Sequence, residues 1–142
     1  MQTTCDSNDK KIAIVEDDPD MKHLYLQILR RQGYSVPFAS ITGEEIVNVV
    51  AKEKTRDSFD LVIIDYSLPG SMNGLEAAKE IASLSPRTQI LMITGEASIE
   101  REARRAGFGF LSKPFEISKL LTCIDSRLKN NLDLQSESLT AN

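Results

Sequence analysis

Short strands that are apolar on both faces alternate along this chain with amphipathic helices. The clearest strand patterns are IAIV at 12–15, LVII at 61–64 and QILMI at 89–93. A strand that is apolar on both faces belongs in a parallel sheet that helices cover on each side. Between these strands, apolar residues recur at the three- and four-residue spacing of a helix. This alternation predicts an α/β fold and excludes a helical bundle or an all-β sandwich.

The pattern divides into five βα units. Strands are expected at 12–15, 34–39, 59–64, 89–93 and 108–112, and helices at 19–32, 42–52, 75–84, 98–106 and 116–130. Right-handed crossovers then give a doubly wound, five-stranded parallel sheet in the flavodoxin-like order 2-1-3-4-5, with helices on both faces. Pro37 makes the second strand an edge strand. Asp18 is the expected N-cap of the helix at 19–32, with Pro19 at the first helical position. We expect residues 1–9 to form a disordered leader, 10–130 the folded domain and 131–142 a polar tail.

Composition excludes several classes of protein. The chain has 142 residues, the size of one domain, and its longest apolar runs are far shorter than the roughly 20 residues of a membrane span. The leader lacks the apolar segment of a signal peptide. Two cysteines, Cys5 and Cys123, are too few for a disulfide framework or a zinc site, which indicates a cytoplasmic protein. A net charge of −4 argues against nucleic-acid binding.

Charged and hydroxyl residues follow four of the five expected strands. Glu16 and Asp17 follow the first strand, Asp65 the third, Thr94 the fourth and Lys113 the fifth. In an open α/β sheet the ligand site lies beyond the carboxyl ends of the strands. We therefore expect these side chains to face one crevice.

Three carboxylates so close together raise one another's pKa unless a cation lies between them. They suit Mg²⁺, a hard octahedral ion that is usually held by protein carboxylates together with phosphate oxygens. A lysine and a hydroxyl beside such an ion provide the charge and the positioning that phosphoryl transfer needs. A carboxylate is the only good nucleophile in this set, so the expected covalent product is an aspartyl phosphate.

Four motifs, in their order and spacing, resemble the receiver domain of two-component response regulators: IAIVEDD, DLVIIDYSLPG, ILMITG and FLSKPF. The match covers about residues 10–130. The resemblance implies that Asp65 is the phosphoacceptor. It also implies that Asp17 binds Mg²⁺ directly, that Glu16 binds it mostly through water, and that Ser67 adds its backbone carbonyl.

The same resemblance implies roles for the later motifs. Thr94 would close on the phosphoryl group and Lys113 would pair with it, while Phe110 would be the aromatic switch. The bond between Lys113 and Pro114 would be cis. Such a protein takes its phosphoryl group from a histidine kinase or a histidine phosphotransfer protein and signals to a downstream protein by contact. It is a switch rather than an enzyme, because it catalyses only its own phosphorylation and autodephosphorylation.

The chain departs from the family pattern in two places. Gly74 follows Asp65 by nine positions, one more than is common, which places an insertion at Ser71 or a neighbour. Lys113 follows Thr94 by only 19 positions, a few fewer than usual. The second departure shortens a helix of the family's output surface.

That output surface would be formed by the helix at 98–106, the strand at 108–112 and the helix at 116–130. Phe110 lacks the hydroxyl of the commoner tyrosine, so it can signal only by packing. The residues expected to face the core from the last helix are Ile117, Leu120, Leu121, Ile124 and Leu128. Apolar positions continue to Leu132, which leaves a homodimer through this helix as an open alternative.

Three other assignments stay open at this point. The chain could be a receiver fragment of a larger regulator or a hybrid kinase. An Asp-dependent Mg²⁺ phosphatase of the haloacid dehalogenase type would carry its nucleophile directly after the first strand, where Glu16 stands. A flavodoxin-like cofactor binder would need a phosphate-binding loop at 16–20, where this chain is acidic.

Overall fold

Five parallel strands form a single sheet in the order β2-β1-β3-β4-β5, so the predicted fold class and strand order are confirmed. The structure is a computed structural model that describes residues 10–52 and 59–140, the stretch 130–140 by its backbone alone. The strands are β1 (Lys11–Val15), β2 (Ser35–Ser40), β3 (Leu61–Ile64), β4 (Gln89–Thr94) and β5 (Gly109–Ser112). β2, which contains Pro37, lies at the edge of the sheet as predicted.

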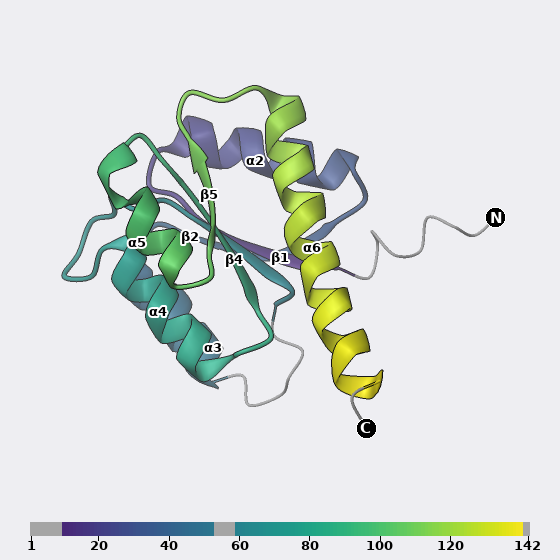
Figure 1. Ribbon diagram of the computed structural model, residues 1–142. Coiled ribbons are helices and arrows are strands. Elements are labelled where there is room, and N and C mark those ends of the chain that lie inside the picture. The colour runs from purple at the N-terminus through teal and green to yellow at the C-terminus, as the bar shows by residue number, and fades with distance from the viewer. Residues whose placement is uncertain (1–9, 53–58, 141–142) are drawn as a thin grey trace.

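Helices cover both faces of this sheet (Figure 1). They are α2 (Pro19–Arg31), α3 (Gly43–Lys52), α4 (Gly74–Leu84), the 3-10 helix η1 (Ala97–Ile99), α5 (Glu100–Arg105) and α6 (Ile117–Thr140). The buried residues of α2 and α6 pack on one face, and those of α3, α4 and α5 pack on the other. Within the described ranges, no helix is both long enough and apolar enough to cross a membrane.

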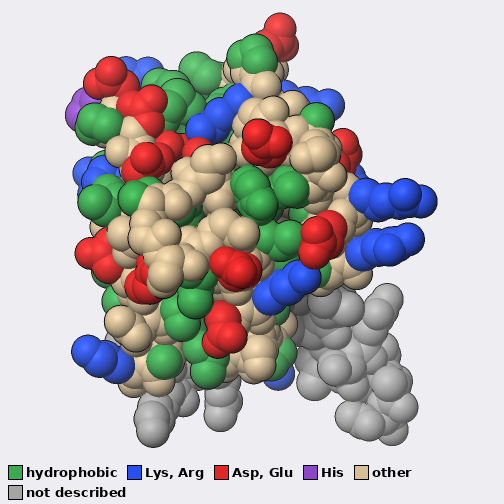
Figure 2. Space-filling view, turned by 90° about the vertical axis from the view of Figure 1, so that its left-hand side faces the viewer, with side chains coloured by type: hydrophobic (Ala, Val, Ile, Leu, Met, Phe, Trp, Pro, Cys, Tyr) green, Lys and Arg blue, Asp and Glu red, His purple; other side chains and the backbone are tan. Residues whose placement is uncertain are grey.

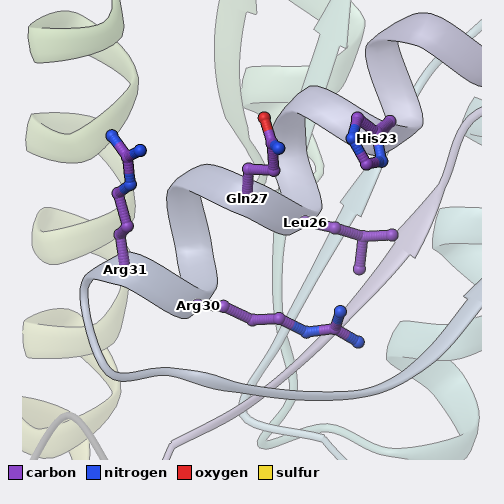
Figure 3. A pocket seen from close by; sticks show the side chains of 5 residues that line it. All are labelled: His23, Leu26, Gln27, Arg30 and Arg31. Atoms are coloured by element: carbon purple, nitrogen blue, oxygen red, sulfur yellow. The ribbon is translucent and has the colours of Figure 1, made fainter.

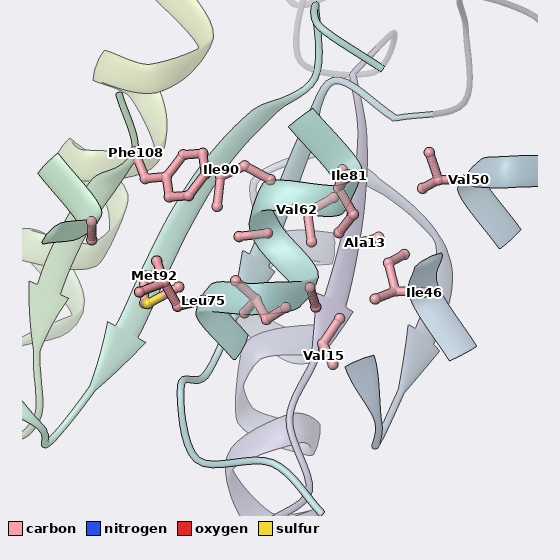
Figure 4. Packing of buried hydrophobic residues seen from close by; sticks show 14 of the residues in the cluster. Ala13, Val15, Ile46, Val50, Val62, Leu75, Ile81, Ile90, Met92 and Phe108 are labelled. Atoms are coloured by element: carbon pink, nitrogen blue, oxygen red, sulfur yellow. The ribbon is translucent and has the colours of Figure 1, made fainter. Parts of the chain in front are cut away.

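Alternate residues of the central strands supply the two cores. Ala13 and Val15 of β1 belong to the cluster under α3 and α4, whereas Ile12 and Ile14 belong to the cluster under α2 and α6. Figure 4 shows the first cluster, in which Ala13 and Val15 lie with residues of β3, β4 and α4. Both faces of the strand are therefore buried, which explains the uninterrupted apolar runs in the sequence.

The last helix differs from expectation at both ends. α6 continues to Thr140, although the sequence pattern placed the end of this helix near residue 130 and a polar tail at 131–142. The polar stretch contains no Pro or Gly, so nothing in it interrupts the helical hydrogen bonds. At the other end Ile117, which we expected in the core, is 48% exposed because the inward face of α6 begins only at Leu120. The leader predicted at 1–9, with Cys5, lies outside the described residues.

The segment between β4 and β5 is short. The charged helix expected at 98–106 consists of the 3-10 turn η1 and the six residues of α5. Arg104 forms an exposed ion pair with Glu100 one turn earlier. Arg101 and Arg105 are also exposed, so this side of α5 faces solvent.

Candidate functional site

The register of the sheet brings the strand-end residues together. Val15 pairs with Ile64, so the residues that follow them, Glu16 and Asp65, lie side by side. The backbone N–H of Asp65 donates to the carbonyl of Val15 at 3.1 Å, and the N–H of Lys113 donates to the carbonyl of Thr94 at 2.9 Å. Parallel pairing thus extends one residue past the strands, which fixes where these side chains leave the sheet.

Glu16, Asp17 and Asp65 form an acidic cluster. Each offers a carboxylate oxygen, and these oxygens all lie within 4.8 Å of one another. Glu16 is 1% exposed and Asp65 is 7% exposed, whereas Asp17 lies at the surface. On the face that Figure 2 shows, acidic side chains (red) lie beside the single histidine of the chain (purple). Closely spaced carboxylates, one of them open to solvent, are the oxygen donors that Mg²⁺ prefers, so the residues present fit this ion.

Lys113 bridges two of the three carboxylates. Its Nζ donates to Asp65 Oδ2 at 3.0 Å and to Glu16 Oε1 at 3.1 Å. Burial alone would lower the pKa of Lys113, but the hydrogen bonds and charges of Asp65 and Glu16 outweigh that effect and raise it. The lysine is therefore held in its charged form inside the cluster. The sequence predicted that Lys113 enters the crevice, but it did not predict the contact with Glu16.

The pKa of Glu16 is raised, first because its carboxyl group is buried and also because of the charge of Asp65. The backbone N–H of Asp18, which donates to Glu16 Oε2 at 3.1 Å, and the ammonium of Lys113 act in the opposite direction. Asp18 itself caps α2 through its side chain, which accepts from the N–H of Asp20 as the sequence predicted. Glu16 thus lies between one backbone donor and one lysine.

The loop after β3 lies against Asp65. The N–H of Ser67 donates to Asp65 Oδ1 at 3.3 Å, so both carboxylate oxygens of Asp65 have a donor. At the far end of the loop, the N–H of Gly74 donates to the carbonyl of Tyr66 at 2.8 Å. A Cβ at position 74 would collide with the carbonyl oxygen of Asp65, so this close approach requires glycine.

Thr94 and Phe110 lie on neighbouring strands. Thr94 is 1% exposed, and its Oγ1 accepts from the N–H of Glu96 at 3.2 Å. Phe110 is buried in the cluster under α3 and α4, and it also lines a surface pocket between α5 and the start of α6. That pocket includes Pro114, and the peptide bond between Lys113 and Pro114 is cis.

His23 does not join the acidic cluster. It lies on the solvent side of α2 and lines an open pocket with Leu26, Gln27, Arg30 and Arg31 (Figure 3). Among the described residues, the carboxylates of Glu16, Asp17 and Asp65 form the one group with the composition and spacing of a metal site.

Comparison with known proteins gives a consistent result. Residues 12–125 match the family model of the response regulator receiver domain. Over 119 residues the chain is 30% identical to the chemotaxis protein CheY of Thermotoga maritima, covering 82% of this chain and 95% of that protein. A solved CheY-like receiver domain protein from Methanospirillum hungatei has a TM-score of 0.77 at 31% identity, covering 87% of this chain and 97% of the other.

Similarity extends to much longer proteins. Over 130 residues the chain is 31% identical to the nitrogen assimilation regulatory protein NtrX of Azorhizobium caulinodans. The matched region is 89% of this chain but only 27% of NtrX. The same type of domain therefore occurs both as most of a small protein and as part of a large one.

Proposed function

Because the chain belongs to the family of response regulator receiver domains, we propose that it is a phosphorylation-dependent signalling switch with Asp65 as its phosphoacceptor. The observation that carries this proposal is the position of Asp65. Its carboxylate lies within 4.8 Å of the carboxylates of Glu16 and Asp17, and 3.0 Å from the ammonium of Lys113. A nucleophile placed between a metal-binding pair and a lysine suits phosphoryl transfer.

Asp17 and Asp65 would hold Mg²⁺ directly, together with the backbone carbonyl of Ser67, while Glu16 would act mostly through water. When bound, the ion neutralises the charge on the phosphoryl oxygens. Without it the three carboxylates repel an incoming phosphoryl group. The exposed position of Asp17 leaves this side of the site open to solvent.

The donor in this proposal is the phospho-histidine of a histidine kinase or a histidine phosphotransfer protein. A carboxylate oxygen of Asp65 forms the new O–P bond, and the P–N bond to the donor histidine breaks with its electron pair left on the imidazole nitrogen. Lys113 then pairs with a phosphoryl oxygen. Its Nζ already lies 3.0 Å from Asp65 and is held by the buried Glu16, so it needs little rearrangement. Hydrolysis of the aspartyl phosphate by water ends the signal.

The output would pass through Thr94 and Phe110. Thr94 Oγ1, which accepts from the N–H of Glu96, would turn to donate to the phosphoryl group. Phe110 would then shift and change the surface of α5, β5 and α6, where a downstream protein binds. Because Phe110 has no hydroxyl and α5 is short, we expect a smaller rearrangement than in receivers with tyrosine at this position.

Three related assignments remain predictions. These are the cytoplasmic location, a homodimer through the last helix, and the place of this domain within a larger regulator or hybrid kinase. The match to 27% of NtrX supports the last of them as an alternative arrangement. The phosphatase and flavodoxin-like alternatives have no support from the family match.

Incubation with acetyl phosphate, followed by intact-mass measurement, tests the proposed function. We expect a mass gain of one phosphoryl group in the presence of Mg²⁺ and none after the metal has been chelated. Absence of a gain with Mg²⁺ would contradict the proposal. A gain of equal size in both conditions would contradict the role of the acidic cluster.

A further inference from the structure

A glutamate from a different βα unit anchors the loop between β3 and α4. Glu44 stands in the first turn of α3, 27 positions before Ser71. Its Oε2 accepts from the backbone N–H of Ser71 at 2.8 Å and from the Oγ of Ser71 at 2.6 Å. Two short hydrogen bonds to one ionised oxygen make a strong anchor.

The backbone of the loop is shaped around this carboxylate. Gly70 has a φ of 96°, which only glycine adopts readily, and a Cβ there would lie 2.8 Å from Glu44 Oε1. The Ser71 hydroxyl, followed by backbone amides that include those of Ser71 and Met72, lowers the pKa of Glu44. The anchor therefore consists of an ionised side chain and a loop conformation that fit each other.

The anchored loop also carries a proposed metal ligand. Ser67 lies in the same loop, and its N–H donates to Asp65 Oδ1. Gly74 closes the base of the loop on Tyr66. Between Ser67 and the anchor stand only three residues, and one of them is Pro69, whose φ is fixed by its ring. A restraint at Ser71 therefore limits the positions that Ser67 can take.

We propose that Glu44 is a positioning residue for the metal site: by holding Ser71, it orders the loop so that the backbone carbonyl of Ser67 faces the acidic cluster. This inference rests on the proposed function, because Ser67 is a metal ligand only there. The loop is one residue longer than the common family pattern, and a longer loop loses more conformational entropy when it becomes ordered. Glu44 offsets part of that cost before the ion arrives.

Titration calorimetry with Mg²⁺ alone, at low ionic strength, tests this proposal. Glu44→Gln and Glu44→Ala both remove the negative charge, so charge affects them equally. Only Glu44→Gln keeps an oxygen that accepts from Ser71. We expect Glu44→Ala to bind Mg²⁺ about tenfold more weakly than Glu44→Gln, because only Glu44→Ala loses both hydrogen bonds that Oε2 accepts from Ser71.

Ser71→Ala gives an independent arm because it leaves the charge of the protein unchanged. It removes the hydroxyl contact at 2.6 Å but keeps the backbone contact at 2.8 Å, so we expect a smaller loss, about threefold. In Glu44→Ala, adding Ser71→Ala should weaken Mg²⁺ binding no further, because their common contact is already gone. Glu80→Ala, on the exposed side of α4, is the matched control and should bind Mg²⁺ as the wild type does.

Hydrogen exchange separates positioning from general destabilisation. In Glu44→Ala without metal, the backbone N–H groups of residues 67, 68 and 70–72 should exchange faster, while those of β1 and β3 do not change. If the wild type binds Mg²⁺ but Glu44→Ala and Glu44→Gln bind it with equal affinity, the proposed role of Glu44 is overturned and the metal site is not. A wild type that binds no Mg²⁺ would overturn the proposed metal site and this inference with it.

Discussion

Lys113 and Glu16 form an ion pair across 97 positions of sequence, with 3.1 Å between Nζ and Oε1. Glu16 is almost completely buried, and this partner, together with the backbone N–H of Asp18, offsets the loss of solvation. The same ammonium also contacts the proposed phosphoacceptor. One lysine thus links the stability of the site to its chemistry.

Removal of this lysine should destabilise the metal-free fold. Lys113→Ala leaves two buried carboxylates without their cation, and we expect a loss of about 2 kcal/mol in the free energy of unfolding, because the pair is partly open to solvent. Lys79→Ala is the control, since its ion pair with Glu102 is exposed on both sides and should contribute about 0–1 kcal/mol. Urea unfolding without Mg²⁺ measures both variants. Equal losses would show that Lys113 does not support the buried carboxylates.

The raised pKa of Glu16 predicts a pH-dependent effect on stability. A carboxyl group whose pKa is raised by folding favours the folded state while it is protonated. This contribution to stability is lost as the pH rises from the usual pKa of the group, 4.5, through its raised pKa in the folded protein. Glu16→Gln, which cannot ionise, should therefore gain stability relative to the wild type between mildly acidic and neutral pH, measured without Mg²⁺. If Glu16→Gln is instead less stable at neutral pH, the attraction to Lys113 outweighs burial.

Neighbouring acids should respond differently to substitution. Asp17→Ala should weaken Mg²⁺ binding by about 10–100-fold, because it removes a proposed direct ligand from the acidic cluster. Asp18→Ala removes the cap of α2 and should cost about 1 kcal/mol of stability, with little change in Mg²⁺ affinity. Calorimetric titration and thermal unfolding of both variants separate these effects. Similar losses of Mg²⁺ affinity would mean that the metal-binding pair is misplaced by one residue.

Much of the fold could be predicted because its signals are local. Apolar runs identified the strands, and Asp18 followed by Pro19 identified the start of α2. The strand order then predicted that the acids after the first strand face Asp65, with Asp17 opposite it, whereas the register pairs Glu16 with Asp65. A family resemblance in four motifs assigned the individual roles.

Other features depend on contacts that no local pattern records. The hydrogen bonds of Glu44 to Ser71 cross 27 positions, and both residues look like ordinary surface residues in the sequence. The sequence predicted an insertion near Ser71, but it did not predict that Glu44 holds this residue. Ile117 was misplaced because helical periodicity does not show where a helix first meets the core.

Thr94 should couple phosphorylation to the output surface. Thr94→Ala keeps the carboxylates and Lys113, so the protein should still accept a phosphoryl group. The response to phosphorylation at α5, β5 and α6 should be lost, because the hydroxyl that moves is missing. Thr94→Ser, which keeps a hydroxyl, is the control and should retain the response.

Hydrogen exchange with and without acetyl phosphate measures this response. In the wild type we expect the changes outside the acidic cluster to be confined to residues 94–115. A response centred on α2 or α3, with 94–115 unchanged, would contradict the proposed route through Thr94 and Phe110.

The location of the phosphoryl group tests the central claim most directly. After labelling with acetyl phosphate and Mg²⁺, peptide mass spectrometry should find the modification on Asp65. Asp65→Asn should gain no mass, while Asp125→Asn, an exposed acid on α6, should be labelled as the wild type is. Labelling of Asp65→Asn to the wild-type extent, or a phosphoryl group mapped to Asp17, would contradict the account.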